Sequence, residues 1–120
     1  VVYGGMAREV EKAAADLFLE DEIDTDIIVP TCIQPLDVEP IVESVSRTGR
    51  LLVVEEGQGF AGFGSEVVAA CSERLGGRRL WTSRVFAAPH PIPSARDQEQ
   101  RSLPQPSDIL AAMRRLASHS

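Results

Sequence analysis

Three glycines between residues 57 and 62 are spaced in a way that could hold a phosphate group. Gly57, Gly59 and Gly62 form the pattern G-x-G-x-x-G, which follows an apolar run and precedes a segment with helical periodicity. In a dinucleotide-binding turn, glycines in this context let backbone amides and the start of a helix approach a pyrophosphate. A nucleotide site is therefore the first chemical hypothesis.

The neighbours of these glycines argue against a nucleotide. Glu55 and Glu56 stand immediately before the first glycine, where two carboxylates would repel a pyrophosphate. The acidic residue that should bind the ribose about twenty residues further on is missing from the end of the next strand. Phe60 and Phe63 place bulky apolar side chains in the turn. We expect the glycines to allow a sharp turn and close helix packing, and the phenylalanines to lie at a protein interface or in the core.

The other candidate catalytic groups are few. His90 stands between two prolines and His119 lies next to the last residue, so no Ser–His–acid or Cys–His set can be assembled. Cys71 falls on the apolar face of an expected helix, which predicts a buried and inert thiol, and Cys32 has no neighbouring base. Glu55 and Glu56 would project to opposite sides of a continuing strand, as surface residues rather than an acid–base pair. We expect no catalytic residue, cofactor site or metal site in this chain.

Composition and charge narrow the class of protein. The 120 residues are 43% hydrophobic and 25% charged, with a formal net charge of −6, which fits one globular domain. The arginines are scattered rather than gathered in a basic stripe, which disfavours nucleic acid. No apolar run reaches membrane-spanning length and no leader-like start is present, so the cytoplasm is the expected location. The acidic run Glu20–Asp26 lacks EF-hand spacing and is expected to be a solvated helix end and turn.

Short apolar strands and amphipathic helices should position these residues. Apolar runs predict strands at residues 1–3, 27–29, 51–54 and 80–86. Helical spacing predicts helices that start at Met6, after a cap at Asp37, at Ser65, and after a cap at Ser107. Pro89 to Pro106 follows neither period, and a span of this kind often has a functional or interface role. Strands that alternate with helices imply a parallel sheet covered on both faces, in a Rossmann-like or flavodoxin-like order.

Five segments in register carry a family resemblance over nearly the whole chain. They are "VVYGGMAREVEKAA", "IQPLD", "GRLLVVEEGQGFAGFGSEV", "RVFAAPHPIP" and "LPQPSDILAAMRRL". Together they resemble the C-terminal domain of the transketolase family, most of all that of beta subunits of thiamine-diphosphate-dependent 2-oxo acid dehydrogenases (pyruvate, branched-chain and acetoin types). The resemblance implies an α/β fold, a three-layer α/β/α sandwich with a mostly parallel sheet and room for one antiparallel strand. It also implies a single domain over residues 1–120, as a fragment of a longer beta-subunit chain.

The same resemblance implies a non-catalytic assembly domain within a larger oxidoreductase. The parent enzyme would decarboxylate a 2-oxo acid on thiamine diphosphate with magnesium and acylate a lipoyl group, and this domain would bind neither cofactor. A second beta subunit, forming a dimer, an alpha subunit and the lipoyl acyltransferase core are the implied partners. The subunit-interface residues expected here are Phe60, Phe63, Glu66, Arg78, Arg79 and Trp81.

The chain departs from the family pattern in two places, and two alternatives stay open. Arg78 and Arg79 stand where pyruvate-type chains often carry an acidic residue, which reverses the charge available for acyltransferase docking. Residues 29–32 replace the usual Asp-Leu-Arg-Thr with Val-Pro-Thr-Cys. One alternative is a stand-alone NADP- or nucleotide-binding module on the Gly57–Gly62 turn. The other is the C-terminal domain of a transketolase or deoxyxylulose-phosphate synthase, although the "LPQPSDIL" ending favours the dehydrogenase type.

Overall fold

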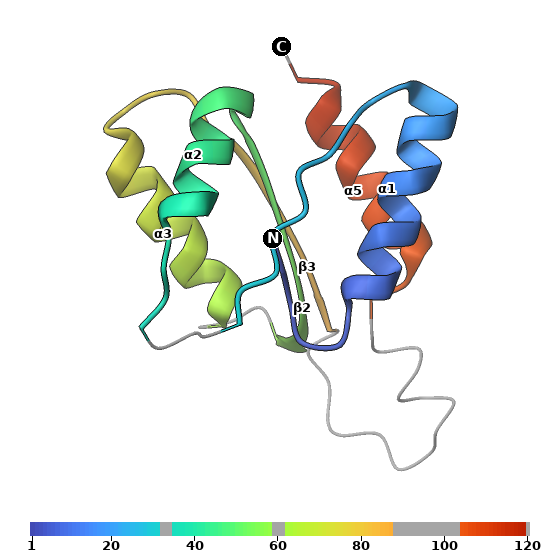
Figure 1. Cartoon of the computed structure of the whole chain (residues 1–120), viewed down its shortest axis with the longest axis horizontal. Coiled ribbons are helices and arrows are strands. Elements are labelled where there is room, and N and C mark those ends of the chain that lie inside the picture. The colour runs from blue at the N-terminus through green and yellow to red at the C-terminus, as the bar shows by residue number, and fades with distance from the viewer. Residues whose placement is uncertain (32–34, 59–61, 88–103, 120) are drawn as a thin grey trace.

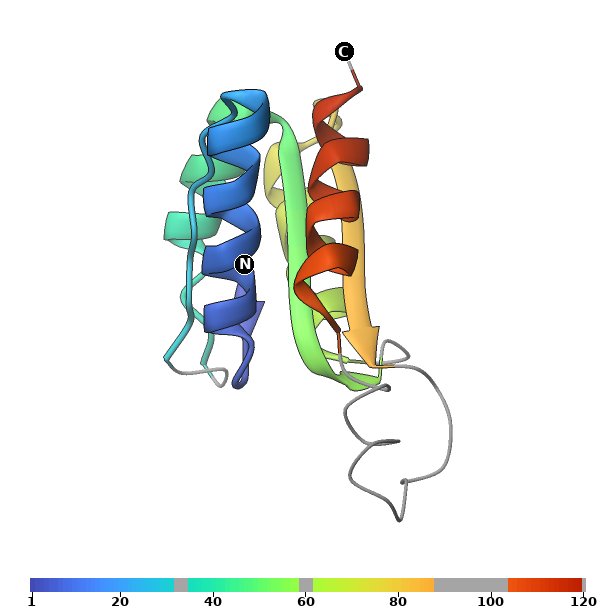
Figure 2. The same ribbon diagram turned by 90° about the vertical axis from the view of Figure 1, so that its right-hand side faces the viewer.

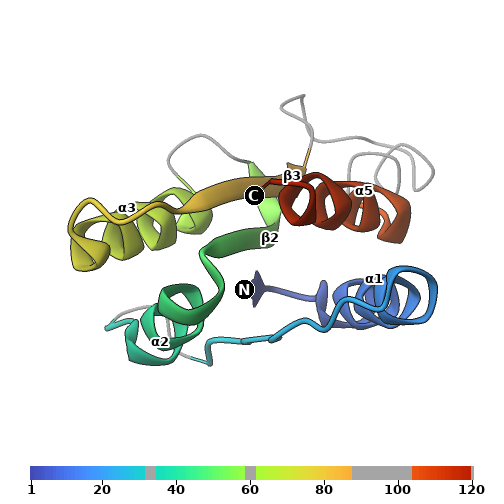
Figure 3. The ribbon, with the colours of Figure 1, turned by 90° about the horizontal axis from the view of Figure 1, so that it is seen from above.

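A computed structural model describes residues 1–31, 35–58, 62–87 and 104–119. The elements in chain order are β1 (Val2–Tyr3), α1 (Ala7–Asp21), α2 (Glu39–Thr48), β2 (Arg50–Gln58), α3 (Phe63–Leu75), β3 (Trp81–Ala87) and α5 (Pro106–Ala117). Helices α2 and α3 lie on one side of the strands, and α1 and α5 lie on the other (Figure 1). The view along the strands shows the same three layers (Figure 3). The expected α/β/α sandwich is therefore confirmed.

The described sheet has three strands in the order β1-β2-β3, and both pairings are parallel. Val2 is in register with Val54, and Leu52 is in register with Ser83. Parallel strands need helical crossovers, which α1 and α2 supply between β1 and β2 and α3 supplies between β2 and β3. Helices α1 and α5 run side by side along one face, as Figure 2 shows. No antiparallel strand occurs within the described residues.

Strand β2 contributes to both hydrophobic cores because successive side chains point to opposite faces. Leu51 and Val53 pack with the α2 and α3 cluster, whereas Val54 packs with the α1 and α5 cluster and Leu52 lies against it. The first cluster contains Ile41, Val45, Leu51, Val53, Val67, Cys71 and Leu75. The second contains Val2, Met6, Val10, Ala13, Leu17, Val54, Ile109 and Met113. The two layers of helices therefore share one strand.

The predicted strand at residues 27–29 does not form. The segment is extended but unpaired apart from one backbone hydrogen bond, from the Val2 N–H to the Ile28 carbonyl at 3.0 Å. Ile28 packs on the α2 and α3 cluster, while Ile27 and Val29 are exposed. The apolar run thus covers the edge of the sheet with one side chain instead of entering it as a strand buried on both faces.

The acidic run ends α1 as expected, but its carboxylates also hold neighbouring helices. Glu20 and Asp21 form ion pairs with Arg114 of α5. Asp26 accepts hydrogen bonds from the Ser44 hydroxyl at 2.8 Å and from the Arg47 guanidinium at 2.6 Å. These two bonds lower the pKa of Asp26. The run is therefore a connector between helices as well as a solvated turn.

The described helices begin one or two residues away from the predicted starts. Helix α3 begins at Phe63, two residues before Ser65. Helix α5 begins at Pro106 and is capped by Gln105 rather than Ser107, because the Gln105 and Asp108 side chains each bond the other's backbone N–H. The cap predicted at Asp37 is one residue off, since the N-cap of α2 is Val38, which makes no side-chain capping bond, although the Asp37 carboxylate accepts from the Glu39 N–H at 3.1 Å. The Pro89–Pro106 segment lies largely outside the described residues.

The Cys71 thiol is expected to be chemically inert in the folded protein. Its residue has no solvent exposure, and burial raises the pKa of the thiol. In a Cys32→Ser variant, Cys71 is the sole cysteine, and its labelling by Ellman's reagent at pH 8 should be at least about 100-fold slower in native buffer than in urea. Comparable rates in the two conditions would contradict the buried position.

Candidate functional site

The carboxyl end of β2 is where an open α/β sheet would bind a ligand, and Glu55 occupies it. The Glu55 residue is 3% exposed, and its carboxylate oxygens lie 3.2 and 3.3 Å from the Gly64 nitrogen in the first turn of α3. A Cβ placed on Gly64 would lie 2.9 Å from Glu55 Oε1 and 3.1 Å from Val53 Cγ1. A side chain at position 64 would therefore collide with the Glu55 carboxylate and with Val53 of β2, which explains the glycine at this position.

Glu56 makes the corresponding contact on the opposite face of β2. Its Oε1 accepts a hydrogen bond from the Gly5 N–H at 2.9 Å, in the turn that leads into α1. A Cβ on Gly5 would lie 2.6 Å from the same oxygen, and Gly4 has a φ of +86°. Two consecutive glutamates thus each bond a glycine amide at the start of a helix, one in each helical layer.

The contact between Glu55 and Gly64 bears directly on whether the glycine pattern holds a phosphate. A phosphate at the start of α3 would need the backbone amides and the positive end of the helix dipole, and Glu55 already takes both. The expectation that the two glutamates project to opposite sides is confirmed, but the expectation of two surface residues is wrong for Glu55. The two adjacent glutamates before the glycines were the sequence signal for this arrangement, because a carboxylate that repels a phosphate can also take the place of the phosphate at the start of the helix.

The interface residues predicted near the glycine turn are only partly described. Phe60 lies outside the described residues. Phe63 begins α3, is half-buried, and its ring centroid lies 5.0 Å from that of Tyr3. Glu66 is exposed in the first turn of the same helix. Phe63 therefore already has an intramolecular partner, whereas Glu66 faces solvent.

The other predicted interface residues lie at the opposite end of α3. Trp81 begins β3, and its ring stacks on His119 with centroids 4.1 Å apart and planes 8° apart. The Arg79 guanidinium lies 5.9 Å from the Trp81 ring centroid, and Arg78 donates to the Ser46 hydroxyl at 3.4 Å. The structure thus separates the predicted residues into two groups, one at each end of the sandwich. The stacking of Trp81 on His119 had no signal in the sequence.

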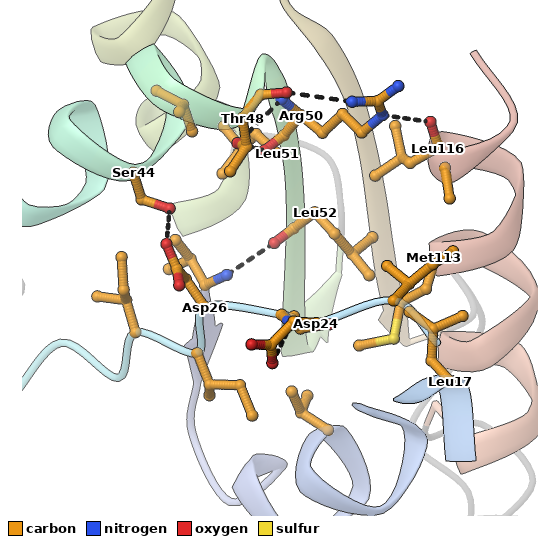
Figure 4. Close-up of a pocket in the computed structure, with 18 of the residues that line it drawn as sticks. Leu17, Asp24, Asp26, Ser44, Thr48, Arg50, Leu51, Leu52, Met113 and Leu116 are labelled. Carbon is orange, nitrogen blue, oxygen red and sulfur yellow. Dashed lines mark hydrogen bonds between the residues drawn. The ribbon is translucent and has the colours of Figure 1, made fainter. Parts of the chain in front are cut away.

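A groove beside β2 was also not foreseen. It lies between α1, α2 and α5 and is lined mainly by aliphatic side chains of both clusters, including Leu17, Leu51, Leu52 and Met113 (Figure 4). Its polar lining comes from Asp24, Thr25, Asp26, Ser44, Thr48 and Arg50. The groove is visible only once the helices are placed in space, because its walls come from segments far apart in the sequence.

The described residues were also searched for a metal site and for a membrane-spanning helix. No group of three or more His, Cys, Asp or Glu side chains within them is placed to hold a metal ion. None of the helices in these segments is long and apolar enough to cross a membrane.

Comparison with known proteins gives consistent matches. The chain matches the family model "Transketolase, C-terminal domain" over residues 1–109. It is 34% identical over 108 residues to the pyruvate dehydrogenase E1 component subunit beta of Rickettsia felis, covering 89% of this chain and 33% of that protein. The Staphylococcus aureus (strain Mu50) subunit of the same name is 46% identical over 74 residues, which is 62% of this chain and 22% of that protein. The chain spans about a third of the length of the Rickettsia relative.

A solved structure shows the same fold. The chain superimposes on a protein described as a split gene transketolase, inactive beta4 tetramer, with a TM-score of 0.82 and 23% sequence identity. The match covers 96% of this chain and 37% of that one.

Proposed function

Since this chain belongs to the family of transketolase C-terminal domains, we propose that it is the C-terminal assembly domain of a 2-oxo acid dehydrogenase beta subunit. In the parent enzyme, a 2-oxo acid is decarboxylated on thiamine diphosphate with magnesium, and the acyl unit passes to a lipoyl group. The domain itself is not catalytic and binds neither cofactor. The parent enzyme belongs in the cytoplasm.

The observation that carries the proposal is the closed carboxyl edge of the sheet. Glu55 is buried against the amide of Gly64 at the position where related topologies bind a ligand. Because a side chain of the protein itself, that of Glu55, fills this edge of the sheet, a structural role is favoured over a binding role. The Rickettsia felis pyruvate dehydrogenase E1 beta relative is about three times as long as the matched segment, which supports placement within a larger subunit.

The proposed contact surfaces are the two ends of the sandwich. At one end, Arg78, Arg79 and the half-buried Trp81 present cationic and aromatic groups, which are favoured at protein interfaces. At the other end, Phe63 and Glu66 lie at the start of α3, and Phe60, which lies outside the described residues, is proposed with them from the sequence. A second beta subunit and an alpha subunit are the proposed partners. Because Arg78 and Arg79 carry positive charge, an acyltransferase core that docks here would have to offer acidic groups.

A stand-alone NADP-binding module is the competing function. It would have to displace the Glu55 carboxylate from Gly64, which leaves a buried charge without its hydrogen bond. The geometry therefore favours the assembly domain.

Light scattering of the 120-residue chain, with and without thiamine diphosphate and NADP, tests the proposal. We expect a dimer whose mass is indifferent to both ligands. Reversing Arg78 and Arg79 to glutamate should weaken the dimer at least about tenfold, because these arginines are proposed at the contact. The matched control reverses the exposed Arg8 and Arg115 instead and should leave the mass unchanged. A monomer that binds NADP with micromolar affinity would contradict the proposal and support a nucleotide-binding site on the glycine turn.

A further inference from the structure

The last turn of α1 exposes two adjacent large hydrophobic side chains. Phe18 is 55% exposed and Leu19 is 77% exposed, the highest values for any large hydrophobic residue within the described segments. The apolar residues on the other side of the helix, among them Val10 and Leu17, are buried in the core. Two neighbouring apolar side chains that face water in this way are typical of a surface that contacts another protein.

The same helix end carries charge that the helix itself does not favour. Glu20, Asp21 and Glu22 follow Leu19, although the C-terminal end of a helix dipole attracts positive charge and the last turn of α1 holds no basic residue. Arg114 neutralises Glu20 and Asp21 through ion pairs. Among the residues that the structure describes, none pairs with the Glu22 carboxylate.

The backbone at Glu22 is also unfavourable for this side chain. Helices α2 and α3 end at Gly49 and Gly76 in the left-handed conformation, which glycine adopts at little cost. Helix α1 ends in the same conformation with Glu22, at a φ of +57°. A glutamate is strained here relative to glycine, and its charge opposes the helix dipole, so the stability of the isolated domain does not explain it. A positive group on a partner protein accounts for a carboxylate at this position.

The turn between α3 and β3, residues 76–80, offers the complementary charge. It contains Arg78 and Arg79 and leads to the half-buried Trp81. A Cβ on Gly76 or on Gly77 would meet no atom within 4 Å, so the turn projects from the domain. Within the described segments, Arg78 bonds a serine hydroxyl but no carboxylate. A carboxylate on a partner protein can therefore reach it.

The α1 end and the α3–β3 turn lie on opposite sides of one face of the molecule. In a parallel sheet the crossover helices run back against the strands, so α1 ends at the edge of the sheet where β3 begins. Figure 1 shows both at the upper end of the sandwich, and the view from above shows them at opposite corners (Figure 3). A two-fold axis that passes between them brings the α1 end of each copy onto the α3–β3 turn of the other.

We propose that this face is the contact between two copies of the chain, with the α1 end of each copy packed against the α3–β3 turn of the other. Glu22 then faces Arg78 of the partner subunit, and Phe18 and Leu19 lie toward its aromatic and cationic end. Each opposite-charge contact occurs twice in such a pair, whereas an arrangement that matched like ends would bring like charges together. The inference rests on the proposed function, since the second copy is the second beta subunit proposed there, and it adds the surface that the arginines contact.

A charge exchange measured by light scattering over a dilution series of the 120-residue chain tests the pairing. Glu22→Lys and Arg78→Glu should each raise the dissociation constant of the dimer at least about tenfold, because each variant places like charges at both contacts. An equal mixture of the two variants should restore the dimer, since a mixed pair has one exchanged and one native contact, both of opposite charge. Glu22→Lys should not lower stability in urea, because positive charge suits the end of α1, so unfolding cannot explain its loss of the dimer.

An apolar pair of variants supplies the matched control. Leu19→Ser should weaken the dimer, whereas Val29→Ser should not, although Val29 is also exposed. Val29 follows Ile28, whose carbonyl bonds the Val2 N–H away from this face.

Two results would overturn the inference and leave the assembly proposal standing. They are a Glu22→Lys chain that dimerises as tightly as the wild type, and a mixture of the two charge variants that stays monomeric. A wild-type chain that is monomeric throughout the dilution series would instead overturn both the proposed dimer and this contact, so the two failures are distinguishable.

Discussion

Replacing Gly64 with valine is expected to lower the free energy of unfolding by about 2–3 kcal/mol. The first added atom would lie 2.9 Å from Glu55 Oε1 and 3.1 Å from Val53 Cγ1. Both neighbours belong to β2 and are buried, so neither can move without disturbing the sheet. The branches of valine would also push the α3 amide away from the Glu55 carboxylate and leave that charge without its hydrogen bond.

The experiment compares Gly64→Val with Gly64→Ala and with Ser72→Val in urea unfolding. The alanine variant tests the first added atom alone and should lose less stability than the valine variant. Ser72 is exposed on the same helix, so its replacement reports the cost of a β-branched residue in α3 without the contact. A Gly64→Val protein that is no less stable than Ser72→Val would show that Glu55 and Val53 do not hold this backbone.

The second large effect expected is a rise in stability of the 120-residue chain between pH 6 and pH 8. Burial lowers the pKa of the Val1 amine from 8.0 to about 6. In this window the unfolded chain still binds the proton and the folded chain does not, so the free energy of unfolding increases with pH. A difference of two pKa units corresponds to a gain of about 3 kcal/mol. The penalty for burying the charge is complete below pH 6 and absent above pH 8.

Acetylation of the Val1 amine supplies the control. The acetylated chain has no terminal amine to titrate, whereas every side chain is the same in the two proteins. Urea unfolding at pH 6, 7 and 8 should therefore give a steeper rise for the unmodified chain. Parallel curves for the two proteins would mean that the amine is solvated in the folded state.

The fold was predictable from the sequence because its strongest signals are local. The periodicity of α1 and α2 and the apolar run of β2 identify helices and strands without reference to their neighbours. The segment at residues 27–29 was mispredicted because an apolar run has the same composition whether it pairs in a sheet or covers its edge. Only the placement of Val2 next to Ile28 distinguishes the two.

The candidate site was predictable in part. The charge of Glu55 and Glu56 was sufficient to disfavour a phosphate, because it depends only on residues adjacent in sequence. The burial of Glu55 was not predictable in the same way, since it requires the start of α3 to fold back onto β2. The groove beside β2 depends on several segments far apart in the chain and left no pattern in any one of them.

The adjacent bonds of Glu55 and Glu56 have a mechanical consequence. They tie the turns that lead into α1 and α3 to neighbouring positions of a single strand, on its two faces. A pull on either helical layer is therefore transmitted through β2 to the other, and the two layers resist sliding past each other along the strand direction. Such stiffness would suit the assembly role proposed above, in which the domain holds its neighbours at a fixed spacing.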